Sequence, residues 1–311
     1  MPDLSTINPI VLIASLMVAA TPILLAGIGE LVVEKAGVLN LGVEGMMITG
    51  AVCGFAVAVT TGNPYLGMLA AIAAGALVSM IFALVTQVLM ANQVATGLAL
   101  TMFGLGFSAL LGQSYVGIVP PQTAKLTFGP LSDLPVVGRI LFGHDILVYV
   151  SLLVVALTWF WLNKTRGGRI LRAVGEDHES AHALGYKVRR VRILAIAFGG
   201  GCAGLGGAYL SLVRVPQWTE GMTAGAGWIA LALVVFASWR PWRVLIGAYL
   251  FGGIMVLQLN LQAAGFRIPV EYLSMSPYLI TILVLVIMSS NRGRASLSAP
   301  GSLGKPFHAA G

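Results

Sequence analysis

The chain has 311 residues, of which 58% are hydrophobic and only 9% are charged, and its net charge is +7. An ordinary soluble domain carries roughly 25% charged residues, so this composition excludes a typical water-soluble protein. Apolar runs of about twenty residues recur along the chain, and at 1.5 Å per residue each can cross a hydrocarbon core of about 30 Å. The sequence therefore predicts an all-α polytopic membrane protein.

Polar breaks divide the apolar runs into about nine spans, within a range of eight to ten, and some of these helices are expected to be broken. The seventh run is short, and it crosses only if it also uses Ala224 to Gly227. The predicted spans are Pro9–Ile28, Val43–Thr61, Tyr65–Leu89, Val94–Gln113, Ile146–Leu162, Val191–Leu212, Ala224–Ser238, Val244–Leu261 and Pro277–Met288.

Nine spans place fourteen of the eighteen Lys and Arg residues on one side of the membrane. Because basic residues accumulate in cytoplasmic loops, this side is predicted to be cytoplasmic, with the N-terminus outside and the C-terminus inside. The positive charge then reports topology, and no nucleic-acid partner is expected. Residues 1–290 are expected to form one transmembrane domain, and residues 291–311, rich in Ser, Pro and Gly, a disordered cytoplasmic tail.

Residues 163–192 form the one sizeable hydrophilic loop. Acidic residues cluster at Glu176, Asp177 and Glu179, where the dipole of a following helix favours negative charge, and Gly185 suits the end of that helix. The loop is therefore predicted to contain a short surface helix, Glu176 to Leu184, that a cytoplasmic partner could push.

The same loop contains His178-Glu179-Ser180-Ala181-His182, which matches the H-E-x-x-H pattern of zinc proteases. A catalytic zinc site also needs a third protein ligand and an enclosed position for water, and the sequence offers neither. A solvated helix is the favoured interpretation, with an intramembrane metalloprotease as the alternative. Gly304-Lys305 is followed by Pro306, so the chain lacks a P-loop, and ATP must be bound by a partner. No metal or cofactor is expected.

Charged residues near membrane depth are functional candidates because a bilayer makes them costly. Glu30, Glu34 and Glu44 flank the stretch "VLNLG", with Lys35 nearby. One interpretation is an interfacial loop in which Lys35 pairs with an acid. The other is a broken helix beside the translocation pathway, with Asn40 and Glu44 shaping a cytoplasmic gate.

Uncharged polar residues in the predicted spans could bind a neutral, hydroxylated substrate, and the preferred candidates are Gln93, Thr96 and Asn260. Interhelical hydrogen bonds explain such residues equally well. Trp218, Trp239 and Trp242 lie near span ends and are expected to be interface anchors.

Three stretches resemble the bacterial ABC permeases of the branched-chain amino acid, ribose and nucleoside group, especially its simple-sugar and nucleoside branch. They are "GELVVEKAGVLNLGVEGMMITG", "GGRILRAVGEDHESAHALGYKVRRVR" and "GWIALALVVFASWRP". The resemblance implies a permease subunit in the bacterial inner membrane that imports nucleosides or simple sugars, with nucleosides preferred. A secondary transporter is the alternative of another class.

The resemblance further implies partners: an ABC ATPase, an extracytoplasmic substrate-binding lipoprotein and a second, longer permease, so that a heterodimer is preferred over a homodimer. His178 and His182 depart from the proline and arginine that are usual in the family's coupling helix. That coupling helix maps onto Gly175, Glu176, Asp177, Glu179, Ala181, Leu184 and Gly185.

Overall fold

A computed structural model describes residues 9–126, 137–263 and 299–308, together with isolated positions between 275 and 286. Within these residues the regular structure is helical, and seven helices are long and apolar enough to span a membrane. The helices are α1 Pro9–Lys35, α2 Val43–Thr61, α3 Pro64–Ala83, α4 Gln93–Gly112, α5 Val137–Leu141, α6 Ile146–Lys164, α7 Arg166–Glu176, α8 His178–Ala183, α9 Val188–Tyr209, α10 Ala226–Phe236 and α11 Pro241–Ala263.

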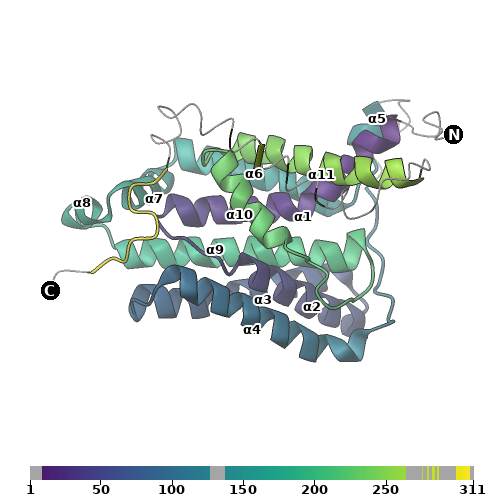
Figure 1. Ribbon diagram of the computed structural model, residues 1–311, viewed down its shortest axis with the longest axis horizontal. Coiled ribbons are helices and arrows are strands. Elements are labelled where there is room, and N and C mark those ends of the chain that lie inside the picture. Colours follow the sequence, from purple (N-terminus) through teal and green to yellow (C-terminus); the bar gives the residue numbers. More distant parts are fainter. Residues whose placement is uncertain are drawn as a thin grey trace.

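The long helices run roughly along one common axis (Figure 1). α9 lies at the centre and packs on α1, α2 and α3, while α11 packs on α1 at the other side of the bundle. Glycines permit the closest approaches: a Cβ on Gly75 or Gly204 would overlap backbone atoms of the facing helix. Small residues are what allow membrane helices to approach, because the apolar bilayer supplies no hydrophobic force between them.

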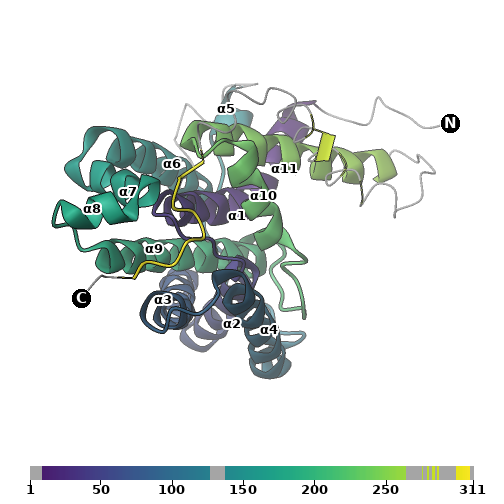
Figure 2. The same cartoon turned by 60° about the vertical axis from the view of Figure 1, so that its left-hand side comes forward.

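The two ends of the bundle differ in composition. α7, α8 and the C-terminal segment, residues 299–308, gather at one end, and α5 lies at the other (Figures 1 and 2). Lys35, Arg172 and Arg240 line one pocket at the first end, although they come from α1, α7 and the turn before α11. We call this the basic end.

The predicted spans one to six and eight are confirmed as helices, whereas the count of nine stays a prediction. The seventh is an 11-residue helix, α10, too short to cross alone at 1.5 Å per residue. The turn after it still reaches the basic end, because Arg240 lies there with Lys35. The ninth run, Pro277–Met288, lies outside the described residues apart from isolated positions.

Two boundaries differ from expectation. α1 continues to Lys35 instead of ending at Ile28, so Glu30 and Glu34 are helical and buried. The C-terminal segment belongs to the stretch 291–311 that we expected to be disordered, yet it packs at the basic end, where Ser302 N–H donates to the Gly175 carbonyl over 2.9 Å and Phe307 is buried. Residues 299–308 therefore pack against the bundle, and the disordered tail stays a prediction for the rest of 291–311.

Candidate functional site

The predicted surface helix is present as α8, and both of its ends are capped. The Asp177 carboxylate accepts from Glu179 N–H at 3.1 Å and Ser180 N–H at 3.3 Å, and the Ser180 hydroxyl also donates to it. These hydrogen bonds, the Ser180 hydroxyl first, lower the pKa of Asp177. At the other end Gly185 has a φ of +86°, and Tyr186 N–H returns to the Ala181 carbonyl over 3.1 Å. This is a Schellman ending, which requires a left-handed residue at the Gly185 position.

One side of α8 is anchored and its tip is free. Ala181 is buried with Val174, Val188 and Phe307 in a small apolar cluster. Leu184, by contrast, is 75% exposed, and a Cβ on Gly185 would meet nothing within 4 Å. Glu176 and Glu179 are exposed as well. The helix therefore presents an apolar tip, Leu184-Gly185, to the space beyond the basic end.

Gly175, near the end of α7, packs against the end of α1. A Cβ on Gly175 would overlap the Lys35 carbonyl oxygen, so only glycine permits this approach. The Gly175 carbonyl in turn accepts from Ser302 N–H of the C-terminal segment. Any displacement of α7 and α8 must therefore also move the Lys35 end of α1 or open this contact.

Arg192 on α9 contacts the end of α1, α8 and the C-terminal segment, and its side chain is fully buried. The guanidinium donates to the Ala36 carbonyl at 3.2 Å and the Lys305 carbonyl at 3.0 Å, and its third nitrogen lies 3.3 Å from His178 Nδ1. Burial, and then the Arg192 charge, lower the pKa of His178. Nδ1 accepts from a permanent cation, so the neutral imidazole with its proton on Nε2 fits this position.

The H-E-x-x-H pattern has a structural role here. Phe307 stacks edge-on against both histidine rings, at 5.4 Å from His178 and 5.2 Å from His182. Within the described residues no third His, Cys, Asp or Glu joins them in a cluster able to hold a metal. Arg192 also places a cation beside the Nδ1 atom of His178. These residues do not fit a zinc ion, and the arrangement supports a packing role.

The candidate pathway residue Asn40 lies in the buried break between α1 and α2. Its side-chain oxygen accepts from Gly42 N–H at 2.9 Å, and its own N–H donates to the Glu30 carboxylate at 3.3 Å. Glu34 accepts from the indole N–H of Trp239, whose backbone has a φ of +53°. Trp239 is thus buried in protein and not an interface anchor, and the same holds for Trp218.

Glu44, the second pathway candidate, holds the beginning of α10. Its carboxylate accepts three hydrogen bonds, from the Thr223 hydroxyl at 2.5 Å, Gly225 N–H at 2.9 Å and Gly227 N–H at 2.7 Å. A negative group at a helix N-terminus meets both unpaired N–H groups and the positive end of the helix dipole. Glu44 therefore acts as a cap supplied by a different helix.

The structure separates the remaining pathway candidates. Gln93 is 5% exposed; its carbonyl oxygen accepts from Leu39 N–H at 2.8 Å, while its Nε2 lacks a partner among the described residues. The Thr96 hydroxyl donates to the Asn92 carbonyl, and the Asn260 side-chain amide donates to the Val256 carbonyl. Each acceptor lies four residues earlier in the chain. Asn260 lies on α11, which packs on α1, α6 and α10. Asn40, Glu44 and Gln93 thus gather around the α1–α2 break, and Asn260 does not join them.

Sequence reasoning missed two features at the basic end. Arg192 was counted only toward topology, although an arginine at the first turns of an apolar helix is itself a signal for a buried hydrogen-bonded role. The contacts of Ser302 and Phe307 gave no such signal, because each joins residues more than 120 positions away.

Comparisons with known proteins agree with this architecture. The family model described as the branched-chain amino acid transport system permease component matches residues 12–288. A putative glucose ABC transporter permease of Haloferax volcanii is 42% identical over 92% of this chain and 93% of its own length. A guanosine ABC transporter permease of Bacillus subtilis is 34% identical over 96% of both chains. A second guanosine permease of Bacillus subtilis is 24% identical over 87% of this chain and 79% of its own length. No solved structure matches the chain.

The family model covers well over half of the chain, and the relatives named as sugar and nucleoside permeases align with nearly all of it. The apolar helices, seven of them long enough to span a membrane among the described residues, agree with a multi-pass subunit. The chain therefore belongs to the permease components of the branched-chain amino acid transport type, in their sugar and nucleoside branch, and is a multi-pass, non-catalytic membrane subunit of an ABC importer.

Proposed function

We propose that this permease moves a neutral, hydroxylated solute, a nucleoside or a simple sugar, into the cytoplasm, and that a partner ATPase drives it through α8. The observation that carries the proposal is the exposed apolar tip of α8, Leu184-Gly185. The other side of α8 contacts Arg192 of α9 through His178, and the preceding helix α7 packs on the Lys35 end of α1 through Gly175. A tip of this kind can seat in a partner and transmit its movement inward. No cofactor of its own is needed, since ATP binds to the partner.

This coupling role requires the basic end to be cytoplasmic, with the N-terminus outside and the C-terminus inside. Lys35, Arg172, Arg190 and Arg240 all belong to that end or to the helices that begin there, as the positive-inside rule asks. We place the subunit in a bacterial plasma membrane with nine crossings, the ninth being Pro277–Met288.

A neutral cargo fits the polar groups around the α1–α2 break. The carboxylates of Glu30, Glu34 and Glu44 already accept hydrogen bonds from the protein. The donor left open there is the amide of Gln93. A hydroxyl can satisfy such an amide without a fixed charge, and the relatives named for glucose and guanosine carry solutes of this class. We place Asn40, Glu44 and Gln93 beside the pathway, and Thr96 and Asn260 as further candidates.

We further propose a heterodimer with a second, longer permease, together with an ABC ATPase and a substrate-binding lipoprotein. Bacillus subtilis supports the pairing: this chain matches one of its guanosine permeases over 96% of that chain's length and another over only 79%. The second relative is therefore longer than the region shared with this chain.

Replacing Leu184 tests the coupling role. Burying a leucine is worth about 1.5–3 kcal/mol, so Leu184→Asp should lower cargo uptake and cargo-stimulated ATP hydrolysis by roughly tenfold or more, with normal membrane expression. Arg243→Ala, an exposed change at the same end, is the control. Normal uptake by the Leu184 variant, or uptake that persists without a cytoplasmic ATPase, contradicts the proposal. Competition by unlabelled guanosine and glucose separates the two cargo classes.

A further inference from the structure

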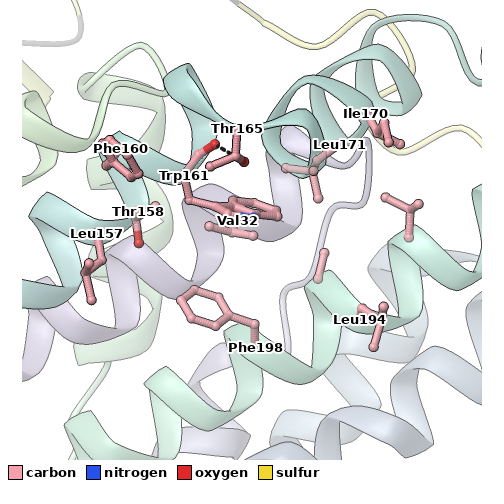
Figure 3. Close-up of a pocket in the computed structure, with 13 residues that line it drawn as sticks. Val32, Leu157, Thr158, Phe160, Trp161, Thr165, Ile170, Leu171, Leu194 and Phe198 are labelled. Carbon is pink, nitrogen blue, oxygen red and sulfur yellow. Dashed lines mark hydrogen bonds between the residues drawn. The ribbon is translucent and has the colours of Figure 1, made fainter.

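A large apolar pocket opens between α1, α6, α7 and α9, and the proposed function makes no use of it (Figure 3). Its volume is about 700 Å³, within the range of small-molecule sites. Leu157 and Phe198 line it near the middle of α6 and α9, Trp161 lies in front of Val32, and Ile170 lies toward the basic end (Figure 3). The pocket therefore runs along the bundle from a mid-helix level to the α6–α7 junction.

The lining carries no charged side chain and only two hydroxyl groups, those of Thr158 and Thr165. The Thr165 hydroxyl is occupied, because it donates to the Trp161 carbonyl at 2.7 Å (Figure 3) and accepts from Gly168 N–H at 3.2 Å. A nucleoside or sugar would bring many hydroxyl groups into a site that cannot pair them. An apolar chain without hydrogen-bonding groups is the occupant that this lining accepts.

The apolar wall is also open at the side. Leu157, Phe160 and Leu194 are 54%, 54% and 61% exposed, and all three line the pocket. Single exposed apolar residues are ordinary, but a contiguous concave group of them marks a binding surface. In a membrane-spanning bundle, the side of a helix pair at this depth faces hydrocarbon chains.

Cations stand just beyond the pocket on each of three helices. Each cation lies four residues from a pocket residue on the same helix, and residues four apart share a helix face. The pairs are Lys164 with Phe160 on α6, Arg166 with Ile170 on α7, and Arg190 with Leu194 on α9. All three cations are exposed. Acidic residues are missing from the sequence between positions 146 and 175 and between 187 and 219. An apolar pocket thus meets a purely positive rim.

We propose that this pocket holds an acyl chain of an anionic phospholipid from the leaflet at the basic end, with the lipid phosphate among Lys164, Arg166 and Arg190. The apolar lining selects a hydrocarbon chain, and the positive rim selects an anionic headgroup over a zwitterionic one. Seven pocket residues, Leu171 and Val191 among them, come from the helices that flank α8. A lipid bound here therefore packs against the supports of the coupling helix.

Quenching of Trp161 fluorescence tests the assignment, because bromine on an acyl chain quenches a tryptophan that it contacts. The full-length chain, purified with its partner subunits, is placed in phosphatidylcholine nanodiscs that contain a small fraction of brominated phosphatidylglycerol or, separately, brominated phosphatidylcholine. Subtracting the signal of Trp161→Phe isolates Trp161. Trp159→Phe is the matched control, since Trp159 lies on the same helix at 37% exposure against 38% but faces Trp242, at a ring distance of 6.5 Å.

We expect brominated phosphatidylglycerol to quench Trp161 more than its share of the lipid predicts, and Trp159 only in proportion to that share. Each basic residue near a membrane surface is worth about fivefold in anionic lipid binding, so Lys164→Gln/Arg166→Gln/Arg190→Gln should remove the preference at Trp161. Equal preference at both tryptophans overturns the proposal, as does a preference unchanged in the triple variant. Absence of quenching at Trp161 by either lipid also overturns it, and then residues 277–288 or the second permease cover the pocket.

Discussion

Replacing Glu44 by glutamine changes one oxygen of a carboxylate that holds the start of α10. The carbonyl oxygen of glutamine can keep the donors of Thr223 and Gly225, but its NH2 group then faces the N–H of Gly227, which donates over 2.7 Å in the native protein. A hydrogen bond to a charged group contributes about 1.5–3 kcal/mol, and an unpaired buried N–H costs about 1–3 kcal/mol. The expected loss of stability is about 3 kcal/mol.

Thermal unfolding of the purified chain measures this loss, which corresponds to a melting temperature lowered by roughly 5–10 °C. Thr223→Val is the graded comparison, since it removes one of the three hydrogen bonds and should cost about 1 kcal/mol. A Glu44→Gln protein with native melting temperature and abolished uptake refutes the reasoning, because Glu44 would then serve the cargo and not α10.

Three further changes test other contacts. Gly204→Ala should destabilise the bundle by about 1–3 kcal/mol, because its Cβ would overlap the Ala71 carbonyl. Gly106→Ala, with open space around it, should be neutral or slightly stabilising, and unfolding curves of the two variants measure the difference. His178 has a lowered pKa, so the folded state binds its proton less well than the unfolded state, and stability present above about pH 6.5 declines below it. Hydrogen exchange at Ser302, corrected for intrinsic rates, should then accelerate on acidification, and a His178→Gln protein that keeps the same pH dependence would exclude this histidine as the cause. Phe307→Ala removes the ring between His178 and His182 and should expose the C-terminal segment to proteases, with uptake as the second measurement.

The helices were predictable because apolar length alone specifies a span. Helix boundaries were less predictable where a buried carboxylate accepts a hydrogen bond from a residue outside the helix. Glu30 and Glu34 looked like the end of a span, yet α1 continues past both, since Asn40 N–H and the Trp239 indole satisfy their carboxylates. The Trp239 contact joins residues 205 positions apart, and a local pattern cannot contain it.

The surface helix α8 was predicted almost in full, because its signals are local: acids before it, a glycine after it, and both caps made by residues within five positions. The packing of the C-terminal segment was not predictable, for the opposite reason. Its Ser, Pro and Gly content is typical of disorder, and its order depends on Gly175, His178 and Arg192. The sequence also did not show which face of α4 meets the α1–α2 break. It is the Thr101 hydroxyl, not that of Thr96, that donates to the Leu41 carbonyl in this break.

These contacts form a continuous physical connection from α8 to the break between α1 and α2. Gly175 of α7 packs against the Lys35 carbonyl, and Arg192 of α9 donates to the Ala36 carbonyl. Directly before Lys35 on α1, Glu34 accepts a hydrogen bond from Trp239 at the turn before α11, and one turn earlier Glu30 accepts one from Asn40.

Contiguity alone does not establish coupling; two sites must bias the same element. Here that element is the end of α1. The neighbours of α8 reach it, α7 through Gly175 at Lys35 and α9 through Arg192 at Ala36, and the α1–α2 break contacts it through Glu30. If an ATPase moves the tip of α8, the Lys35 end of α1 is the part that has to follow. Trp239→Phe keeps the ring but removes the N–H that reaches Glu34, so it should weaken the link between ATP hydrolysis and uptake while leaving α8 in place.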